Sequence, residues 1–151
     1  MFPRMARSEF PPSPATTAPS LQDIEAVTAR AYASLPETLA AFVKNVVIRI
    51  EEFPDEEIQA EFELESPFDL LGLYRGVALT DQGVNDLRTD VDMIHIYRRP
   101  ILDYWCDSGE DLTDIVRHVL IHEIGHHFGF SDEDMDRLEA QAEESERIPH
   151  A

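Results

Sequence analysis

Two histidines and a glutamate near the C-terminal end of the chain have the spacing of a metal-binding and acid–base site. His122, Glu123 and His126 form the pattern H-E-x-x-H. A helix would present both imidazoles on one face, about 40° apart around its axis and ~6 Å apart along it. Two neutral imidazoles suit Zn²⁺, and a carboxylate as third ligand would leave a fourth position for water. Glu123, displaced around the helix, would miss the metal and reach that water as a general base, so the pattern predicts a zinc-dependent hydrolase.

The residues that follow extend the pattern to H-E-x-x-H-x-x-G-x-x-D. Gly129 would let the helix stop and turn the chain back, so that Asp132 could supply an oxygen ligand. The segment 131–134 is also typical of a helix start with acidic residues in its first turn, which requires no metal. We expect Asp132 to be the third ligand and keep the glutamates of the last helix as alternatives: Glu139, Glu143 and Glu144.

Further histidines and tyrosines are candidates for a role in this site. His118 extends the pair to a ladder with four-residue spacing, which could bind a metal without catalysis, but it lies a full turn upstream and is expected to lie outside the metal ligands. His127 would point about 100° away from His126 and is not expected to bind the ion. Three tyrosines are candidates to stabilise an oxyanion, although packed aromatic side chains are commoner: Tyr74, Tyr97 and Tyr104.

Apolar periodicity predicts the elements that position these residues. Ser20 is expected to cap a helix over 21–34, and further helical segments are expected at 37–43, 112–128 and from Ser131 or Asp132 to about Glu144. Strands are expected at 45–51, 71–79 and 91–97, with a loop or short helix in the acidic stretch 51–65 and a short segment opened by Pro100. These elements predict one α+β domain over 21–144, with a short mixed sheet flanked by helices and H-E-x-x-H on a long helix. The Pro-, Ala-, Ser- and Thr-rich residues 1–20 and residues 145–151 are expected to be tails, the first of them disordered.

Composition narrows the possible partners and the compartment. The formal net charge of −19 disfavours nucleic acid and anionic membrane surfaces, and it would attract divalent cations or basic peptides. No apolar run approaches the ~20 residues that cross a bilayer, and none is typical of a secretory signal. The single cysteine, Cys106, cannot form an intramolecular disulfide, and we expect it to be buried beside Trp105. These features predict a soluble, cytoplasmic protein.

At the extended motif the chain resembles the zincin-like metallopeptidases, and more narrowly the small bacterial proteins described as minimal zincins. The resemblance covers about 21–144 and implies a compact sheet flanked by helices, with an edge strand beside the metal helix. It also implies a Zn²⁺ cofactor and hydrolysis of peptide or protein substrates. An extended peptide could add to a sheet edge around 73–79 or 91–97. The residues that match the common pattern of this group are His122, Glu123, His126, Gly129 and Asp132.

Three functions of different classes are consistent with the sequence. The first is a zinc peptidase with Glu123 as general base. The second is a non-catalytic metal-binding or peptide-binding module that retains the zincin fold. This second reading is favoured by the small size and by the absence of the methionine turn found in the related metzincins, since Met135 follows Asp132 by only three residues. The third is a purely structural role for the histidines.

Overall fold

The protein has a mixed α+β fold, as the sequence predicts. The computed structural model describes residues 17–76 and 92–147. Residues 1–16 and 148–151 of the predicted tails, and residues 77–91 of the predicted strands, lie outside the described residues. The elements are α1 (Leu21–Ala33), α2 (Glu37–Ala40), β1 (Val47–Glu51), α3 (Glu56–Glu61), the 3₁₀ turn η2 (Pro67–Asp69), β2 (Gly72–Arg75), β3 (Met93–Tyr97), α4 (Arg98–Ser108), α5 (Leu112–His127) and α6 (Asp132–Arg147).

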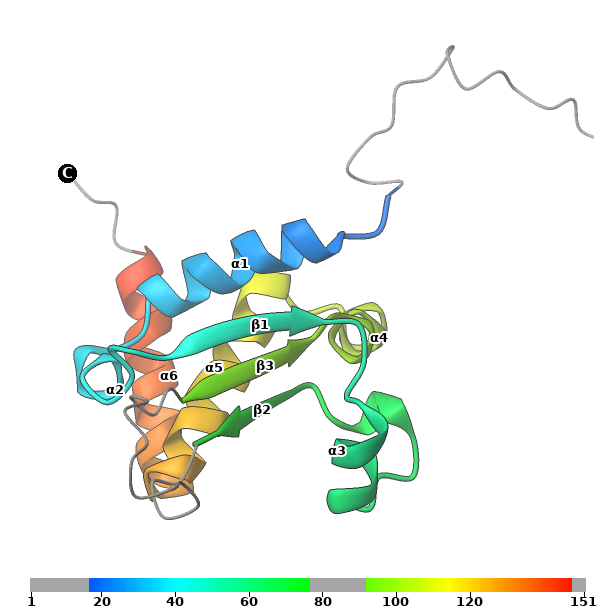
Figure 1. Ribbon diagram of the computed structural model, residues 1–151. Helices are drawn as coiled ribbons and strands as arrows, with labels where there is room; N and C mark the ends of the chain where they lie inside the picture. Colours follow the sequence, from blue (N-terminus) through cyan, green and yellow to red (C-terminus); the bar gives the residue numbers. More distant parts are fainter. Residues whose placement is uncertain (1–16, 77–91, 148–151) are drawn as a thin grey trace, which may run out of the picture.

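The three strands form a mixed sheet in the order β1-β3-β2. β3 pairs in parallel with β1 and antiparallel with β2, so it is the central strand (Figure 1). Within the described part of the chain, β2 therefore has one paired side and one outer side. The predicted sheet edge around 73–79 begins on this outer side of β2, whereas the prediction of an edge at 91–97 is wrong, because β3 is paired on both sides.

The main core lies between the sheet and the helices behind it. Alternate residues of β3, Ile94 and Ile96, point to this side and are fully buried. α1 and α5 pack against each other and against the sheet, with α6 beyond α5 (Figure 1). Tyr97 points to the opposite face, where it forms a smaller cluster with Ile58 of α3 and Leu73 of β2. Two-residue periodicity in the strand thus divides its side chains between the two cores.

The residue types at its two ends explain where helix α5 begins and ends. The Asp111 side chain accepts a hydrogen bond from the N–H of Asp114, which satisfies one of the free donors of the first turn. At the other end Gly129 has φ of 80°, a conformation that favours glycine. Its N–H donates to the carbonyl of His126, and that of Phe130 donates to the carbonyl of Gly125, as in a Schellman motif. The predicted stop at Gly129 is confirmed.

Three local expectations differ from the structure. α2 ends at Ala40 rather than Val43, because the chain continues through tighter turns. The segment around Pro100 is an eleven-residue helix, α4, in which Pro100 occupies the first turn, where its missing N–H costs no hydrogen bond. The expectation that Cys106 is buried is wrong, because it lies about 140° around α4 from the buried Ile101 and is exposed. No helix in the described ranges has the length and hydropathy needed to cross a membrane.

Candidate metal centre

Helix α5 carries the predicted histidine ladder on one side. The ring centroids of His118 and His122 are 4.0 Å apart with the planes tilted by 31°. The centroids of His122 and His126 are 5.8 Å apart, with nearly perpendicular rings. His122 is therefore the shared member of two histidine pairs, and the upstream pair is the closer one.

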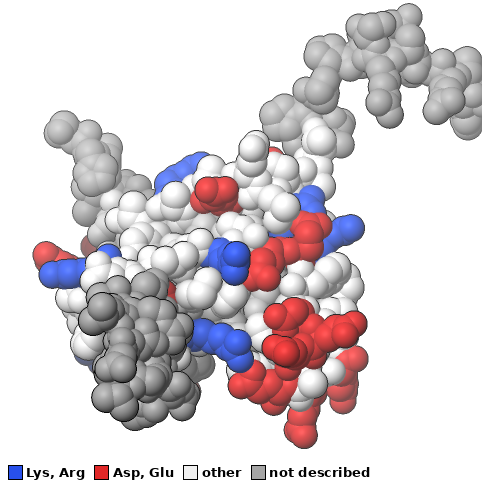
Figure 2. Space-filling view, viewed as in Figure 1, with Lys and Arg blue, Asp and Glu red and all other residues white. Residues whose placement is uncertain are grey.

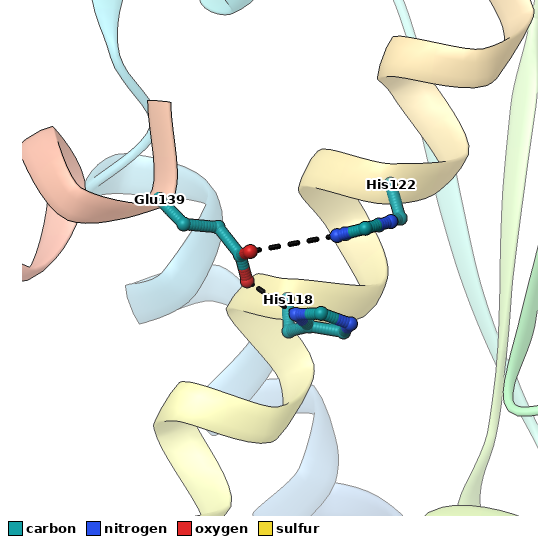
Figure 3. Close-up of side chains that lie close together, drawn as sticks. All are labelled: His118, His122 and Glu139. Atoms are coloured by element: carbon teal, nitrogen blue, oxygen red, sulfur yellow. Dashed lines mark hydrogen bonds and ion pairs between the residues drawn. The ribbon is translucent and has the colours of Figure 1, made fainter. Parts of the chain in front are cut away.

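Glu139 of α6 joins the upstream pair. One oxygen of its carboxylate contacts Nδ1 of His118, and the other lies 3.4 Å from Nε2 of His122 (Figure 3). The three residues can each offer a ligand atom such that all three atoms lie within 4.8 Å of one another. Among the residues that the structure describes, no other three His, Cys, Asp or Glu side chains meet this limit. We call His118, His122 and Glu139 the His118 cluster.

The residues predicted from the motif lie further apart. We call His122, His126 and Asp132 the motif ligands. Nε2 of His126 and Oδ1 of Asp132 are 3.8 Å apart, and the two side chains are 59% and 91% exposed. Asp132 is the first residue of α6, and the Ser131 side chain caps that helix by accepting from the N–H of Asp134. Asp132 thus lies in the first turn of a helix, which is the alternative role that the sequence predicted for it. Its assignment as a metal ligand stays a prediction.

Glu123 lies between the histidine helix and the edge of the sheet. Its Oε2 accepts a hydrogen bond of 3.2 Å from the backbone N–H of Tyr74 in β2. Burial raises the pKa of the Glu123 carboxyl, and the hydrogen bond from Tyr74 and the nearby His126 lower it by less. The result is a carboxyl that holds its proton more tightly than a solvent-exposed glutamate does. The sequence placed this group beside His122, but it did not indicate the strand that orients it.

The match to known families agrees with this arrangement. Residues 43–142, about two thirds of the chain, match the family described as zincin-like metallopeptidase. This chain belongs to the zincin-like metallopeptidases. The family implies a metal ion, usually zinc, and peptide substrates. A search of curated proteins finds no match to the chain.

The donor atoms of this zincin-like chain fit a zinc ion. Nε2 of His122 is shielded from solvent and has no hydrogen-bond partner in the part of the chain that the structure describes, since its contact with Glu139 lacks hydrogen-bond geometry. A buried nitrogen without a partner is costly unless it binds something, and a neutral imidazole nitrogen is a preferred zinc ligand. The other nearby donors are imidazole nitrogens and carboxylate oxygens, which are also typical of zinc sites.

The remaining aromatic and histidine residues of the zincin-like chain have other partners. His127 stacks on Tyr74 with ring centroids 4.1 Å apart, on the side of β2. The Tyr74 hydroxyl donates to Asp92 at 2.5 Å, and burial together with Asp92 raises its pKa. Tyr97 is fully buried, and its hydroxyl has no hydrogen-bond partner among the residues that the structure describes. Of the three candidate oxyanion donors, Tyr104 is the one that is exposed, and the nearby Glu110 raises the pKa of its hydroxyl.

A pocket of about 490 Å³ lies beside the His118 cluster. Helices α4, α5 and α6 form its walls, and His118 and Glu139 are among the residues that line it. Its other polar side chains are mainly acidic, and of the residues within 17–76 and 92–147 neither Lys nor Arg lines it. The acidic side chains besides Glu139 are Glu110, Asp114, Asp136 and Glu143.

Proposed function

We propose that this zincin-like protein is a zinc-dependent peptidase in which Glu123 is the general base and His122, His126 and Asp132 hold the metal. The position of Glu123 carries the proposal. Glu123 follows His122, whose Nε2 has no hydrogen-bond partner among the described residues, and its carboxyl is hydrogen-bonded to the edge strand of the sheet. A structural glutamate on a helix would be more stable in solvent, whereas a general base needs a fixed, partly desolvated position.

The outer side of β2 supports an extended peptide as substrate. The N–H of Tyr97 donates to the carbonyl of Leu71. Because the backbone groups of an antiparallel strand alternate in direction, the N–H and C=O groups of Gly72 and Tyr74 face away from β3. Because the Tyr74 N–H already donates to Glu123, a substrate strand could hydrogen-bond to the outward groups of Gly72 and to the Tyr74 carbonyl, and it would lie alongside Glu123. This is the position at which a scissile carbonyl would meet the base.

The proposed reaction is hydrolysis of a peptide bond. A zinc ion, when bound, polarises carbonyl groups and lowers the pKa of water. Glu123 accepts a proton from the water that attacks the carbonyl carbon. The C–N bond then breaks, and Glu123 returns the proton to the leaving nitrogen, giving one new carboxyl group and one new amine. A raised pKa suits this double role, because the same carboxyl must first accept and then donate a proton.

Digestion of a peptide library by the zinc-loaded protein tests the proposal. We expect cleavage that stops on chelation and falls by about 10²–10⁴-fold in Glu123→Gln, the usual contribution of a general base. Glu133→Gln, at an exposed position in the first turn of α6, is the matched control and should cleave at the wild-type rate. Elemental analysis of Glu123→Gln should still find bound zinc. Intact peptides in the presence of stoichiometric zinc would contradict the proposal and favour a non-catalytic metal- or peptide-binding module.

A further inference from the structure

The histidine ladder of α5 contains two overlapping pairs with the spacing of metal ligands. His118 and His122 form one pair, and His122 and His126 form the other. Two histidines four residues apart on a helix can hold one ion, and this holds for either pair. The motif accounts for the second pair only. The first pair is the more compact, with ring centroids 4.0 Å apart against 5.8 Å.

A third donor reaches the first pair from another helix. Glu139 is half-buried and contacts both rings, one with each carboxylate oxygen (Figure 3). In a tetrahedral zinc site with bonds of about 2.0 Å, ligand atoms lie about 3.3 Å apart. The ligand atoms of the His118 cluster lie within 4.8 Å of one another, so small side-chain rotations would bring them to that spacing. A site built on two histidines and one carboxylate leaves a fourth position open.

The packing of α6 on α5 fixes where Glu139 lies. Met135, Leu138 and Ala142 are buried against the main core, and Glu139 follows Leu138 at the edge of that apolar face. A Cβ on Gly125 would lie 2.4 Å from Sδ of Met135, so the absence of a side chain there lets the helices approach. Glu139 is therefore held opposite His118 and His122 by the core.

We propose that the His118 cluster is a second metal-binding position, which shares His122 with the motif ligands and is occupied instead of them. Since an imidazole normally coordinates one ion through one nitrogen, His122 can serve one position at a time. A metal ion in the His118 cluster would lie nearer the start of α5 than one held by the motif ligands. Glu123 would be badly placed to act there, because His118 lies about 7.5 Å before it along the helix axis.

This second position would hold zinc in a form that is not productive for hydrolysis. The Glu123 carboxylate accepts a hydrogen bond from the Tyr74 N–H, so it faces the edge strand β2. The His118 cluster instead borders the acidic pocket between α4, α5 and α6. The carboxylates of that pocket would attract a divalent cation from solvent to His118 and Glu139. The inference concerns metal binding and does not require that hydrolysis occurs.

Zinc titration of the full-length, metal-stripped protein in competition with a chromophoric chelator tests the proposal. The variants are His118→Ala, His126→Ala and the double variant, with His127→Ala as the matched control. His118 and His126 are both more than half exposed, so these substitutions should leave the fold intact, which circular dichroism would check. We expect each single variant and the control to bind one zinc ion per chain. The double variant, and equally His126→Ala combined with Glu139→Gln, should lose stoichiometric binding.

Either of two results would overturn the proposal. If His126→Ala alone releases zinc as completely as the double variant, the motif ligands are the only position. If His118→Ala alone does so, the His118 cluster is the only position. Peptide cleavage by zinc-loaded His118→Ala is measured separately. Absence of cleavage in both this variant and the wild type would count against the peptidase and leave the zinc-binding result unchanged.

Discussion

At the scale of single residues, burial has two opposing effects on Glu123. Burial beside β2 orients the carboxyl, but it also disfavours its ionised form and so raises its pKa. In the absence of metal, the folded protein therefore binds this proton more tightly than the unfolded chain does. The stabilising contribution of the group is complete below the ordinary glutamate pKa, and it is lost as the pH rises through the raised value in the folded state.

Replacing the carboxyl by an amide should therefore stabilise the metal-free protein at neutral and higher pH. Glu123→Gln keeps an oxygen that can accept from the Tyr74 N–H and removes the desolvated charge. We expect a gain of about 1 kcal/mol in the free energy of unfolding at pH 8, which shrinks as the pH falls towards that of an ordinary glutamate. Urea unfolding of chelator-treated protein at several pH values measures it, with Glu133→Gln as control. Equal or lower stability of Glu123→Gln at pH 8 would contradict this account of Glu123.

The third ligand can also be tested at the residue scale. In the His118→Ala background, which removes the second position, Asp132→Ala should weaken zinc binding by about tenfold or more if Asp132 binds the metal, whereas Glu133→Ala next to it should not. Both residues are exposed in the first turn of α6, so the two changes remove similar favourable interactions with the helix dipole. Competition titration against a chelator gives the two affinities. Equal affinities would leave Asp132 as a helix-start residue and favour Glu139.

At the scale of elements, one buried arginine joins α1 to α5. Arg117 is 2% exposed, and it donates to Ser34 after the end of α1 at 3.1 Å and to Asp114 in the first turn of α5 at 2.7 Å. Its aliphatic stem is buried with its charge, so removing it would lose packing as well as hydrogen bonds. The contact holds the two helices that cover the sheet in a fixed relation.

We expect Arg117→Ala to lower the free energy of unfolding by about 3 kcal/mol. The matched control is Arg137→Ala, because Arg137 also pairs with an aspartate three residues before it, at 3.2 Å, but is 65% exposed. That variant should change stability by less than about 0.5 kcal/mol. Chemical unfolding of both variants gives the comparison. Similar losses in the two would mean that burial of Arg117 adds little to the pair.

At the scale of the whole molecule, acidic residues outnumber basic ones by 31 to 12, and some of them gather around one helix (Figure 2). Figure 2 shows acidic side chains gathered at the lower right, where Figure 1 places α3. This helix contains Glu56, Glu57 and Glu61 and lies within the acidic stretch 51–65. Of these, Glu61 pairs with Arg75 of β2 at 2.7 Å. The formal net charge of −19 is thus accompanied by a local concentration of like charges around α3 (Figure 2).

Added salt should stabilise the metal-free protein. The Debye length falls from about 10 Å at 0.1 M to about 3 Å at 1 M, which weakens repulsion among the carboxylates more than it weakens the few exposed ion pairs. We expect the melting temperature to rise by roughly 4 °C between those concentrations of NaCl, which corresponds to about 1 kcal/mol. Thermal unfolding with KCl should give the same shift. A melting temperature that falls with salt would show that attractive pairs, such as Arg75 with Glu61, outweigh the repulsion.

The sequence by itself determined the ends of several elements and the spacing of the histidines on the metal helix. Ser20 caps α1 as predicted, the alternation in β3 divides its side chains between two cores, and Gly129 ends α5. These features were predictable because each depends on residues within a few positions along the chain. The same holds for the H-E-x-x-H spacing, since helix geometry alone sets the relation of His122 to His126.

Only the tertiary structure decided which groups from distant segments meet at that helix. The backbone N–H that orients Glu123 belongs to Tyr74, 49 residues earlier in the chain. No residue type predicts this contact, because every strand has backbone N–H donors. The sequence offered three glutamates of the last helix, and the structure brings Glu139 alone of these into contact with His122. That contact depends on how closely α6 approaches α5 at Gly125 and Met135. Distances between packed elements depend on the whole core, and for this reason local spacing could not determine them.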